Sequence, residues 1–448
     1  MVKFSKTLGY AMPPIETLLT ARWIIPVEPD GTVLDHHAIA MAGGRIVDIL
    51  PTDQARIQYP EAVEEPFPAH ALIPGFINTH THAAMSLLRG IADDQPLMIW
   101  LAEHIWPLEQ KWMGEAFVRD GSDLAMAEMI RGGITCFNDM YFFPEVTARQ
   151  VRRCGMRAVL GMILIDFPSA WASGPDEYLE KGLALHDELL NDPLISLAFA
   201  PHAPYTVSDG PLSRVRTLAA ELDRPIHMHL HETRHEVEQS LEQHGMRPLQ
   251  RLQQLDLLGP GYLAVHMTQL SDEEIAVIAH SGASVVHCPE SNLKLASGFC
   301  PVARLVRAGV NVAIGTDGAA SNNDLDVMGE MRMAALLAKA VDDDASAIPA
   351  HTALRMATLN GARALGLDGE TGSLVRGKAA DITAIRLDGI ETQPLFNPIS
   401  DLVYAASRHQ VTDVWVAGKR LLKQRELTTL NLAEISRKAA LWRDKLMP

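Results

Sequence analysis

Cysteine is rare in this sequence: it occurs four times in 448 residues, and no two cysteines are spaced as Cys-x-x-Cys. A cysteine zinc site or a dithiol redox motif is therefore not expected. The four residues are Cys136, Cys154, Cys288 and Cys300. We expect them to be buried free thiols, as is usual in a reducing cytosol.

Positive charge and long apolar runs are also scarce. Lysine and arginine number 39 against 55 acidic residues, a net charge of -16, whereas nucleic-acid-binding domains present a basic patch. No apolar run approaches the roughly 18 residues that a transmembrane helix needs, and residues 1–19 lack the apolar core of a signal peptide. We therefore expect a cytoplasmic globular protein without a nucleic-acid or membrane partner.

Glycine-serine linkers, internal repeats and a Gly-x-Gly-x-x-Gly fingerprint after the first strand are absent as well, which disfavours an open dinucleotide-binding sheet. Short apolar runs alternate with amphipathic stretches such as 114–131 and 272–280, which predicts parallel strands joined by helices. Eight strand candidates predict a (β/α)8 barrel, whose strands all end at one mouth. They are 75–82, 134–140, 157–164, 195–200, 225–230, 262–266, 283–288 and 310–316.

The flanks of the predicted barrel have a different pattern of short β segments and glycine turns. Hairpins are predicted at 40–47 and 414–422, and a helix at 431–447. Each flank is short for an independent domain, so we expect the two to join in one small β-sandwich. The predicted organisation is β-sandwich from 1–72 and 373–448, with the barrel at 73–372.

Histidine has the most informative spacing in the chain. His80 and His82 follow the apolar run 71–79. Residues two apart on a strand face the same side, so both imidazoles can point toward one metal ion. Such a pair alone is weak evidence among 18 histidines, but further ligand candidates recur at the ends of later predicted strands.

The fifth and eighth predicted strands supply those further candidates. His227, His229 and His231 are spaced by two, so strand parity alone does not decide which of them faces a metal. Asp317 ends the eighth strand. Three imidazoles and one carboxylate suit zinc and leave room for a water molecule.

Two more side chains could transfer protons at such a centre. Glu232 lies three residues after His229, so it must leave the strand's alternation and lie on the following loop, where a partly dehydrated carboxylate could act as a proton shuttle. His266 ends the sixth predicted strand. It could polarise the attacking water or the leaving group, or only orient Asp317 or the metal.

Lysine is absent between Lys181 and Lys294, an interval that spans the fourth to sixth predicted strands. Barrel hydrolases that hold two metal ions often bridge them with a carbamylated lysine. The absence of lysine from these strands favours one metal ion per subunit.

These residues together resemble the amidohydrolase superfamily, whose members are metal-dependent barrel hydrolases with a flanking β-sandwich. The resemblance extends over most of the chain and includes the motifs at 74–82 and 372–381. Other blocks are more specific and are similar to the 5-methylthioadenosine/S-adenosylhomocysteine deaminases. They lie at 106–109, 201–205, 229–233, 291–295 and 315–323.

The resemblance implies a metal-binding set and a set of proton-transfer residues. The implied ligands of one zinc or other divalent metal ion are His80, His82, His229 and Asp317. Glu232 and His266 would assist proton transfer, and Asp317 would take a proton from the attacking water. The implied reaction is hydrolytic deamination at C6 of an adenine nucleoside, with Glu232 protonating N1.

The resemblance also implies contacts with the substrate. Glu109 would accept hydrogen bonds from the ribose hydroxyls, and His202 would contact the purine or the sugar. Ser321 would lie near the same pocket, and Glu232 and Asp317 would also touch the substrate.

The basic residues suggest which nucleoside is preferred. Arginine is absent between Arg157 and Arg214, the interval where the family can hold the carboxylate of S-adenosylhomocysteine, and Lys181 is the one basic residue there. We therefore expect 5'-methylthioadenosine or adenosine to be preferred. The apolar candidates for contact with a methylthio group are Met162, Ile163, Phe167 and Trp171.

Two other functions stay open from the sequence. A relative of the guanine deaminase or chlorohydrolase type, acting on a free base or a triazine, would use the same metal set, since a fold does not fix the substrate. A catalytically silent binding barrel is disfavoured because the ligand candidates and Glu232 are all present. Cytidine-type zinc deaminases are excluded, because Cys288-Pro289 reverses the order of their Pro-Cys-x-x-Cys signature.

We also expect a homo-oligomer, since barrels of this kind commonly pair.

Overall fold

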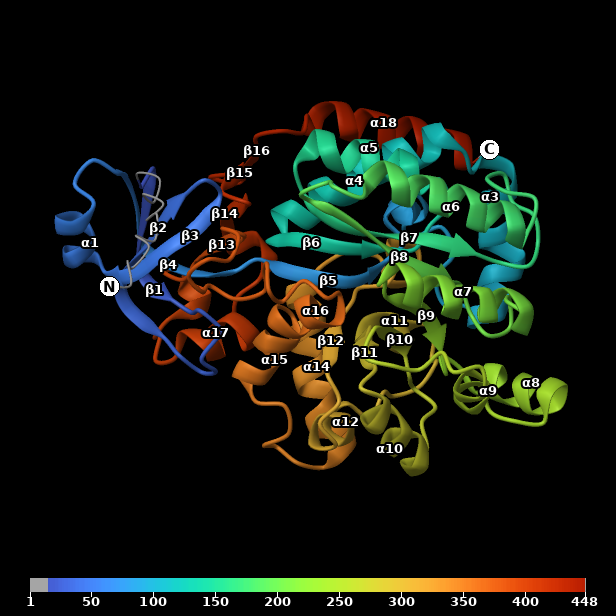
Figure 1. The fold of residues 1–448 in the computed structure, drawn as a ribbon. Helices are drawn as coiled ribbons and strands as arrows, with labels where there is room; N and C mark the ends of the chain where they lie inside the picture. The colour runs from blue at the N-terminus through green and yellow to red at the C-terminus, as the bar shows by residue number, and fades with distance from the viewer. Residues whose placement is uncertain (1–14, 448) are drawn as a thin grey trace, which may run out of the picture.

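The computed structural model describes residues 15–447, and Figure 1 shows a barrel with a β domain beside it. The barrel sheet has the order β12-β11-β10-β9-β8-β7-β6-β5, and every neighbouring pair is parallel. Its strands are β5 (Phe76–Thr81), β6 (Ile134–Asp139), β7 (Arg157–Leu164), β8 (Ile195–Pro201), β9 (Ile226–Leu230), β10 (Tyr262–His266), β11 (Ser284–His287) and β12 (Val312–Ile314). The predicted (β/α)8 barrel is confirmed, and each predicted strand end lies within two residues of the observed one.

The first and last barrel strands meet through hydrogen bonds at their ends. The backbone N–H of Asp317 donates to the carbonyl of His80 (3.0 Å), and the Thr79 hydroxyl donates to the carbonyl of Ile314 (2.7 Å). Gly315 permits this approach, because a Cβ there would lie 2.8 Å from the backbone nitrogen of His80. Closure of the barrel therefore brings Asp317 beside His80.

Helices follow the strands and cover the outside of the barrel (Figure 1). Local signals set their ends: α10 begins with a capping box between Ser271 and Glu274 and ends before Gly282, which has a φ of +76°. The helices before β9 are α1 (Thr52–Gln58), η1 (Ala83–Leu88), α2 (Leu97–Ile99), η2 (Trp100–Ile105), α3 (Trp106–Trp112), α4 (Glu115–Arg131), α5 (Pro144–Cys154), α6 (Pro175–Leu189) and α7 (Asp209–Leu222).

The helices after β9 complete the outer layer and extend onto the β domain. They are α8 (Arg234–His244), α9 (Pro248–Gln254), α10 (Asp272–Ser281), α11 (Pro289–Lys294), α12 (Val302–Arg307), α13 (Ala319–Asn322), α14 (Val327–Asp342), α15 (Ala350–Met356), α16 (Leu359–Ala364), η3 (Ile390–Thr392), α17 (Pro398–Tyr404), η4 (Arg408–Gln410) and α18 (Leu432–Leu446). Among residues 15–447, none of these helices is long and apolar enough to cross a membrane.

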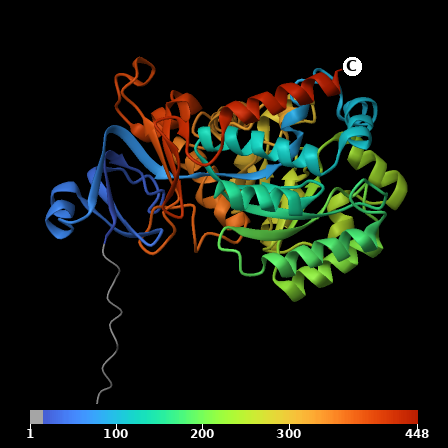
Figure 2. The same ribbon diagram turned by 90° about the horizontal axis from the view of Figure 1, so that it is seen from above.

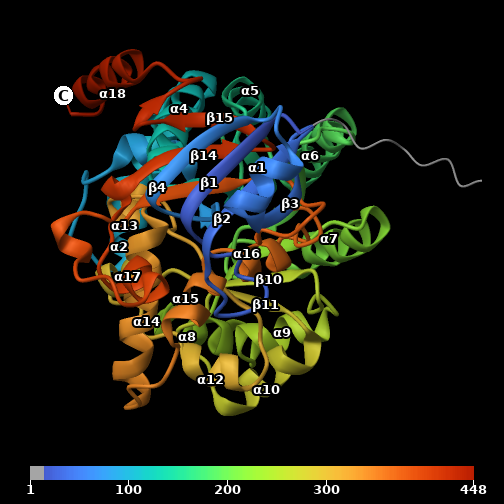
Figure 3. The ribbon, with the colours of Figure 1, turned by 90° about the vertical axis from the view of Figure 1, so that its left-hand side faces the viewer.

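The β domain joins the two flanks of the chain, as predicted. Its strands form one mixed sheet in the order β16-β15-β14-β13-β4-β1-β2-β3. They are β1 (Thr17–Ile24), β2 (Leu34–Ala42), β3 (Arg45–Pro51), β4 (Val63–Pro74), β13 (Ile382–Arg386), β14 (Val411–Val416), β15 (Lys419–Lys423) and β16 (Glu426–Leu427). β4 pairs in parallel with β1 and antiparallel with β13, so the N-terminal and C-terminal segments hydrogen-bond at this strand. Figure 3 looks onto this sheet.

Two connections tie the β domain and the C-terminus to the barrel. β4 ends at Pro74 and leads directly through Gly75 into β5. The predicted C-terminal helix is α18, which lies along α4 (Figures 1 and 2), where the indole N–H of Trp442 donates to Asp120 (3.0 Å). The domain limits 1–72, 73–372 and 373–448 stay a prediction.

Candidate metal centre and active site

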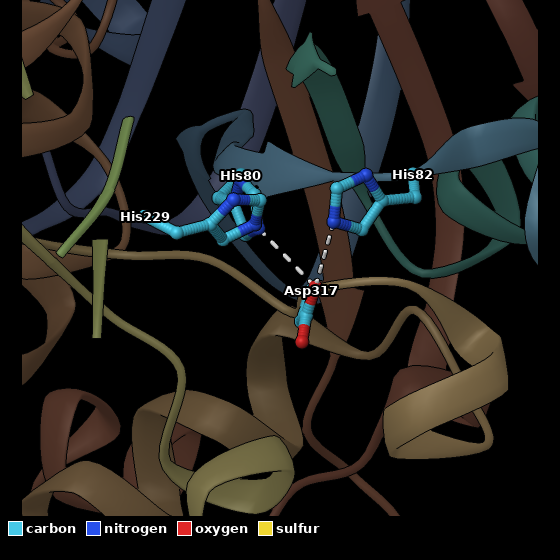
Figure 4. A group of neighbouring side chains, drawn as sticks. All are labelled: His80, His82, His229 and Asp317. Carbon is cyan, nitrogen blue, oxygen red and sulfur yellow. Dashed lines mark hydrogen bonds and ion pairs between the residues drawn. The ribbon is translucent and has the colours of Figure 1, made fainter. Parts of the chain in front are cut away.

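Three histidines and one aspartate meet at the mouth of the barrel (Figure 4). His80 lies on β5, His82 directly after it, His229 on β9, and Asp317 three residues after the end of β12. Oδ1 of Asp317 lies 3.2 Å from Nε2 of both His80 and His82. Nε2 of His229 lies 3.2 Å from Nε2 of His80, and all four ligand atoms lie within 4.8 Å of one another.

This spacing fits a single zinc-like ion. Two ligands that each lie about 2.0–2.1 Å from one ion at tetrahedral angles are roughly 3.3–3.4 Å apart. The three measured separations of 3.2 Å are close to that edge length. Among residues 15–447, no other group of three or more His, Cys, Asp or Glu side chains is arranged to hold a metal ion.

The opposite ring nitrogens of the histidines have their own partners. Nδ1 of His82 donates to the carbonyl of Met140 (2.6 Å), and Nδ1 of His229 donates to the carbonyl of His202 (2.7 Å). These bonds fix the ring orientations and direct Nε2 of both rings toward the other ligand atoms. Nδ1 of His80 hydrogen-bonds to Nε2 of His227 (2.8 Å).

The structure shows which of the three histidines at 227, 229 and 231 is a candidate metal ligand. Strand alternation alone had left this open. His227 lies behind His80, and its Nδ1 is 3.1 Å from the Asn138 amide. The chain turns at His231, which has a φ of +52°, and the ring points away from the mouth, where its Nε2 accepts the N–H of Leu249 (3.0 Å). His229 alone of the three joins the ligand group.

Burial and the Asp317 carboxylate shift the pKa values of the centre in different directions. Burial opposes protonation of His82, but the hydrogen bond to Asp317 and its charge outweigh burial and raise the pKa of His82 to about 9. Burial lowers the pKa of His229 well below its ordinary value, so the ring is neutral at neutral pH. Burial opposes ionisation of Asp317, but hydrogen bonds from His80 and His82 outweigh it and hold the pKa of Asp317 well below its ordinary range. The centre therefore presents an anionic oxygen and a neutral imidazole to a cation.

Two serines hold the second oxygen of Asp317. The hydroxyls of Ser291 and Ser321 donate to Oδ2 at 2.7 Å and 2.8 Å, which leaves Oδ1 for the metal. Ser321 also lines the cavity described below. Its contact with a substrate stays a prediction. Ser291 lies in one of the family-like blocks, but no pattern in the sequence predicts its contact with Asp317.

A cavity of about 680 Å³ opens over the metal centre. All the residues predicted to contact substrate line it: Glu109, His202, Glu232, Asp317 and Ser321. His266 lines it as well. Apolar side chains of η2 and α3 form part of the wall, among them Trp100, Leu101, Ile105 and Trp106. No lysine or arginine among the described residues lines this cavity.

Glu109 is held in the cavity by a residue that sequence reasoning missed. The Tyr141 hydroxyl, from the loop after β6, donates to Oε1 of Glu109 (2.7 Å). Burial raises the pKa of Glu109, and the Tyr141 hydrogen bond acts in the opposite direction. No motif in the sequence linked the two residues, which are 32 positions apart.

The proposed proton-transfer residues lie on one side of the cavity. Oε2 of Glu232 is 3.9 Å from Nε2 of His266, whose Nδ1 hydrogen-bonds to Oδ1 of Asn292 (2.8 Å). Burial raises the pKa of Glu232, which suits a group that must both hold and release a proton near neutral pH. Burial lowers the pKa of His202 to about 3, so that ring is neutral.

Of the four apolar side chains expected to contact a methylthio group, two line the cavity. Ile163 and Phe167 line the cavity, whereas Met162 and Trp171 do not. Met162 alternates with Ile163 on β7 and faces outward, where it packs against Gly182 of α6. Trp171 is buried against the Tyr178 ring, with a centroid separation of 5.6 Å.

Comparison with known proteins agrees with this geometry. Residues 71–421 match the model of the amidohydrolase family. The chain belongs to the amidohydrolase family. It is 54% identical over 432 residues to the 5-methylthioadenosine/S-adenosylhomocysteine deaminase of Teredinibacter turnerae, covering 96% of this chain and 98% of that protein. The chain is a metal-dependent hydrolase that acts on C–N bonds.

Solved structures show the same fold. An adenosine deaminase from Xanthomonas campestris with bound zinc is 54% identical and superimposes with a TM-score of 0.95, covering 97% of this chain and 99% of that one. The atrazine chlorohydrolase of Arthrobacter aurescens, in a structure with zinc, is 22% identical with a TM-score of 0.88, covering 95% and 99% of the two chains. The second similarity concerns the fold alone.

Proposed function

We propose that this protein hydrolyses the C6 amino group of an adenine nucleoside, with 5'-methylthioadenosine as the preferred substrate and 5'-methylthioinosine and ammonia as products. One observation carries the proposal: a single cavity is lined by three of the four metal-ligand candidates, His82, His229 and Asp317, and by the acids Glu232 and Glu109. Metal and acid serve hydrolysis, and Glu109 offers an acceptor to a ribose diol. The similarity to named deaminases supports the same substrate class.

The proposed cofactor is one zinc ion per subunit, bound by His80, His82, His229 and Asp317. When bound, such an ion lowers the pKa of a coordinated water molecule toward about 7 and so supplies a nucleophile at neutral pH. The donor set, the 3.2 Å spacings and the zinc in the solved relative support this choice.

The chain's own residues then move the protons. Asp317 accepts the proton of the attacking water. Glu232 donates a proton to N1 of the purine, which relieves the negative charge that builds on the ring as C6 becomes tetrahedral. His266, 3.9 Å from Glu232, orients the attacking water beside these two acids. Asp317 then passes that proton to the C6 nitrogen, the C6–N bond breaks to release ammonia, and the proton of the new C6 hydroxyl returns to Glu232 as the carbonyl forms.

The rest of the substrate is recognised by shape and by one carboxylate. Glu109 accepts hydrogen bonds from the ribose hydroxyls, and the neutral His202 contacts the purine or the sugar. The apolar wall, which includes Ile163 and Phe167, surrounds a methylthio group. The cavity has no basic side chain among the described residues to pair with an amino-acid carboxylate. Lys181 is the one basic residue between Arg157 and Arg214, and it forms an ion pair with Glu177 (2.7 Å).

A comparison of kcat/KM for 5'-methylthioadenosine, adenosine and S-adenosylhomocysteine tests this preference. A charged group without a hydrogen-bonded ion-pair partner loses about 1.5–3 kcal/mol of interaction free energy. The kcat/KM for S-adenosylhomocysteine should therefore be at least about ten-fold lower than that for 5'-methylthioadenosine. A higher kcat/KM for S-adenosylhomocysteine would refute the preference. The cytoplasmic location, the homo-oligomer and the absence of a nucleic-acid partner stay predictions.

A further inference from the structure

The carboxylate of Glu232 has little to hold it in place. It accepts no hydrogen bond from any residue in 15–447, and its nearest basic neighbour is Nε2 of His266 at 3.9 Å. The residue is only 5% exposed, so water does not surround it. The position of this acid must therefore be set by its backbone.

The backbone at Glu232 is clamped by the side chain of Glu236. Oε1 of Glu236 accepts the N–H of His231 (2.9 Å), and Oε2 accepts the N–H of Glu232 (2.7 Å). The hydroxyl of Thr268 donates to the carbonyl of Glu232 (2.7 Å). The clamp lies where the chain leaves β9 at His231, a residue with a φ of +52° that costs backbone strain.

Glu236 is itself well placed and is used for little else. It lies in the first turn of α8, whose cap is formed by the Thr233 hydroxyl accepting the N–H of Glu236 (3.2 Å). The side chain is 4% exposed and forms no ion pair with any lysine or arginine in the described part of the chain. Burial raises the pKa of Glu236 to about 8, and the hydrogen bonds from the two backbone N–H groups, which occupy both of its oxygens, act in the opposite direction.

We propose that Glu236 is a positioning residue for the deamination, acting only through Glu232. Its two hydrogen bonds hold the turn at 231–232 so that the Glu232 carboxylate faces N1 of the bound purine. This inference rests on the proposed function of Glu232 as the proton donor. A glutamine at 236 keeps the shape but offers one acceptor in place of two and sets an amide N–H against a backbone N–H.

A double-mutant cycle on the zinc-loaded enzyme tests the proposal. With 5'-methylthioadenosine, Glu236→Gln should lower kcat about 10- to 100-fold, with KM and zinc content little changed. In a Glu232→Gln background the same substitution should lower kcat less than about three-fold, since residues that act as one unit are not additive. An equal loss in both backgrounds, or a loss of zinc, would overturn the proposal. If Glu236→Gln does not fold, Glu236→Asp takes its place in the cycle, because the shorter carboxylate does not reach both N–H groups.

Amide hydrogen exchange on the zinc-free protein gives a second readout that needs no turnover. Peptides that contain residues 231 and 232 should exchange at least about ten-fold faster in Glu236→Gln than in the unmodified protein. The matched control is Glu238→Gln, an exposed acid two positions along α8, which should change neither exchange nor kcat. Unchanged exchange rates in Glu236→Gln would show that Glu236 does not hold the backbone at residues 231 and 232. Faster exchange in a protein that deaminates no nucleoside would instead retain the clamp and refute the proposed function.

Discussion

The hydroxyl of Tyr141 donates a 2.7 Å hydrogen bond to Oε1 of Glu109, joining the loop after β6 to helix α3 in the wall of the cavity. The bond fixes one oxygen of Glu109 and leaves the other for substrate. Because it favours the ionised carboxylate, it opposes the rise in pKa that burial causes. Recognition of a ribose diol should therefore depend on both residues.

Replacing Tyr141 by phenylalanine should raise KM for 5'-methylthioadenosine about three- to ten-fold, with a smaller effect on kcat. Loss of the donor raises the pKa of Glu109 further, so the ionised fraction falls as the pH falls. The increase in KM should accordingly be larger at pH 6 than at pH 8, as measured from initial rates. A KM ratio that is the same at both pH values would contradict this role.

Glu109→Gln should reduce kcat/KM for 5'-methylthioadenosine by roughly 10- to 100-fold, because hydrogen bonds to a charged acceptor contribute about 1.5–3 kcal/mol. The 2',3'-dideoxy analogue lacks the hydroxyls that Glu109 would accept from. Its kcat/KM should change less than about three-fold, and steady-state kinetics with both compounds makes the comparison. Equal losses for the two nucleosides would show that Glu109 does not recognise the diol.

Glu232→Gln should lower kcat about 10²- to 10⁴-fold, the usual contribution of a positioned general acid. The four ligand side chains are untouched, so zinc content measured by elemental analysis should stay at that of the unmodified protein. Turnover that is unchanged by the substitution would remove Glu232 from the mechanism.

His229→Asn should abolish tight zinc binding, because it removes one of three imidazoles from the centre. Competition with a chromophoric chelator measures the affinity directly. His235→Asn is a matched control, since His235 is exposed on α8 and lies outside the ligand group. Similar zinc affinities in the two variants would argue against the assigned ligand set.

Much of the metal centre could be predicted from the sequence because the fold makes it regular. Parallel strands of a barrel end at one mouth. Each of three ligand candidates lies at or just past a strand end, so the fold necessarily brings them close together. They are His80, His82 and Asp317. The hydrogen bond from the Asp317 N–H to the His80 carbonyl joins the ends of the first and last barrel strands and brings these two ligand candidates together. The strands themselves were predictable because the strands of such a barrel are short apolar runs that alternate with helices.

The remaining features depend on geometry that periodicity does not encode. His227 and His229 share a strand face, and only the depth of each along β9 decides that one supports His80 while the other joins the ligands. Glu236 has the sequence context of a solvated acid in a polar helix, yet the turn at His231 buries it against two backbone N–H groups. Met162 faces away from the cavity although its neighbour Ile163 lines it, because a run of apolar residues does not show which of its members face inward.

The most direct test measures ammonia and 5'-methylthioinosine formed from 5'-methylthioadenosine by the purified protein, before and after removal of metal by a chelator. We predict one ammonia per nucleoside consumed, loss of the reaction on chelation, and recovery when zinc is added back. Zinc-loaded protein that releases no ammonia from 5'-methylthioadenosine, adenosine or S-adenosylhomocysteine would contradict the proposed function.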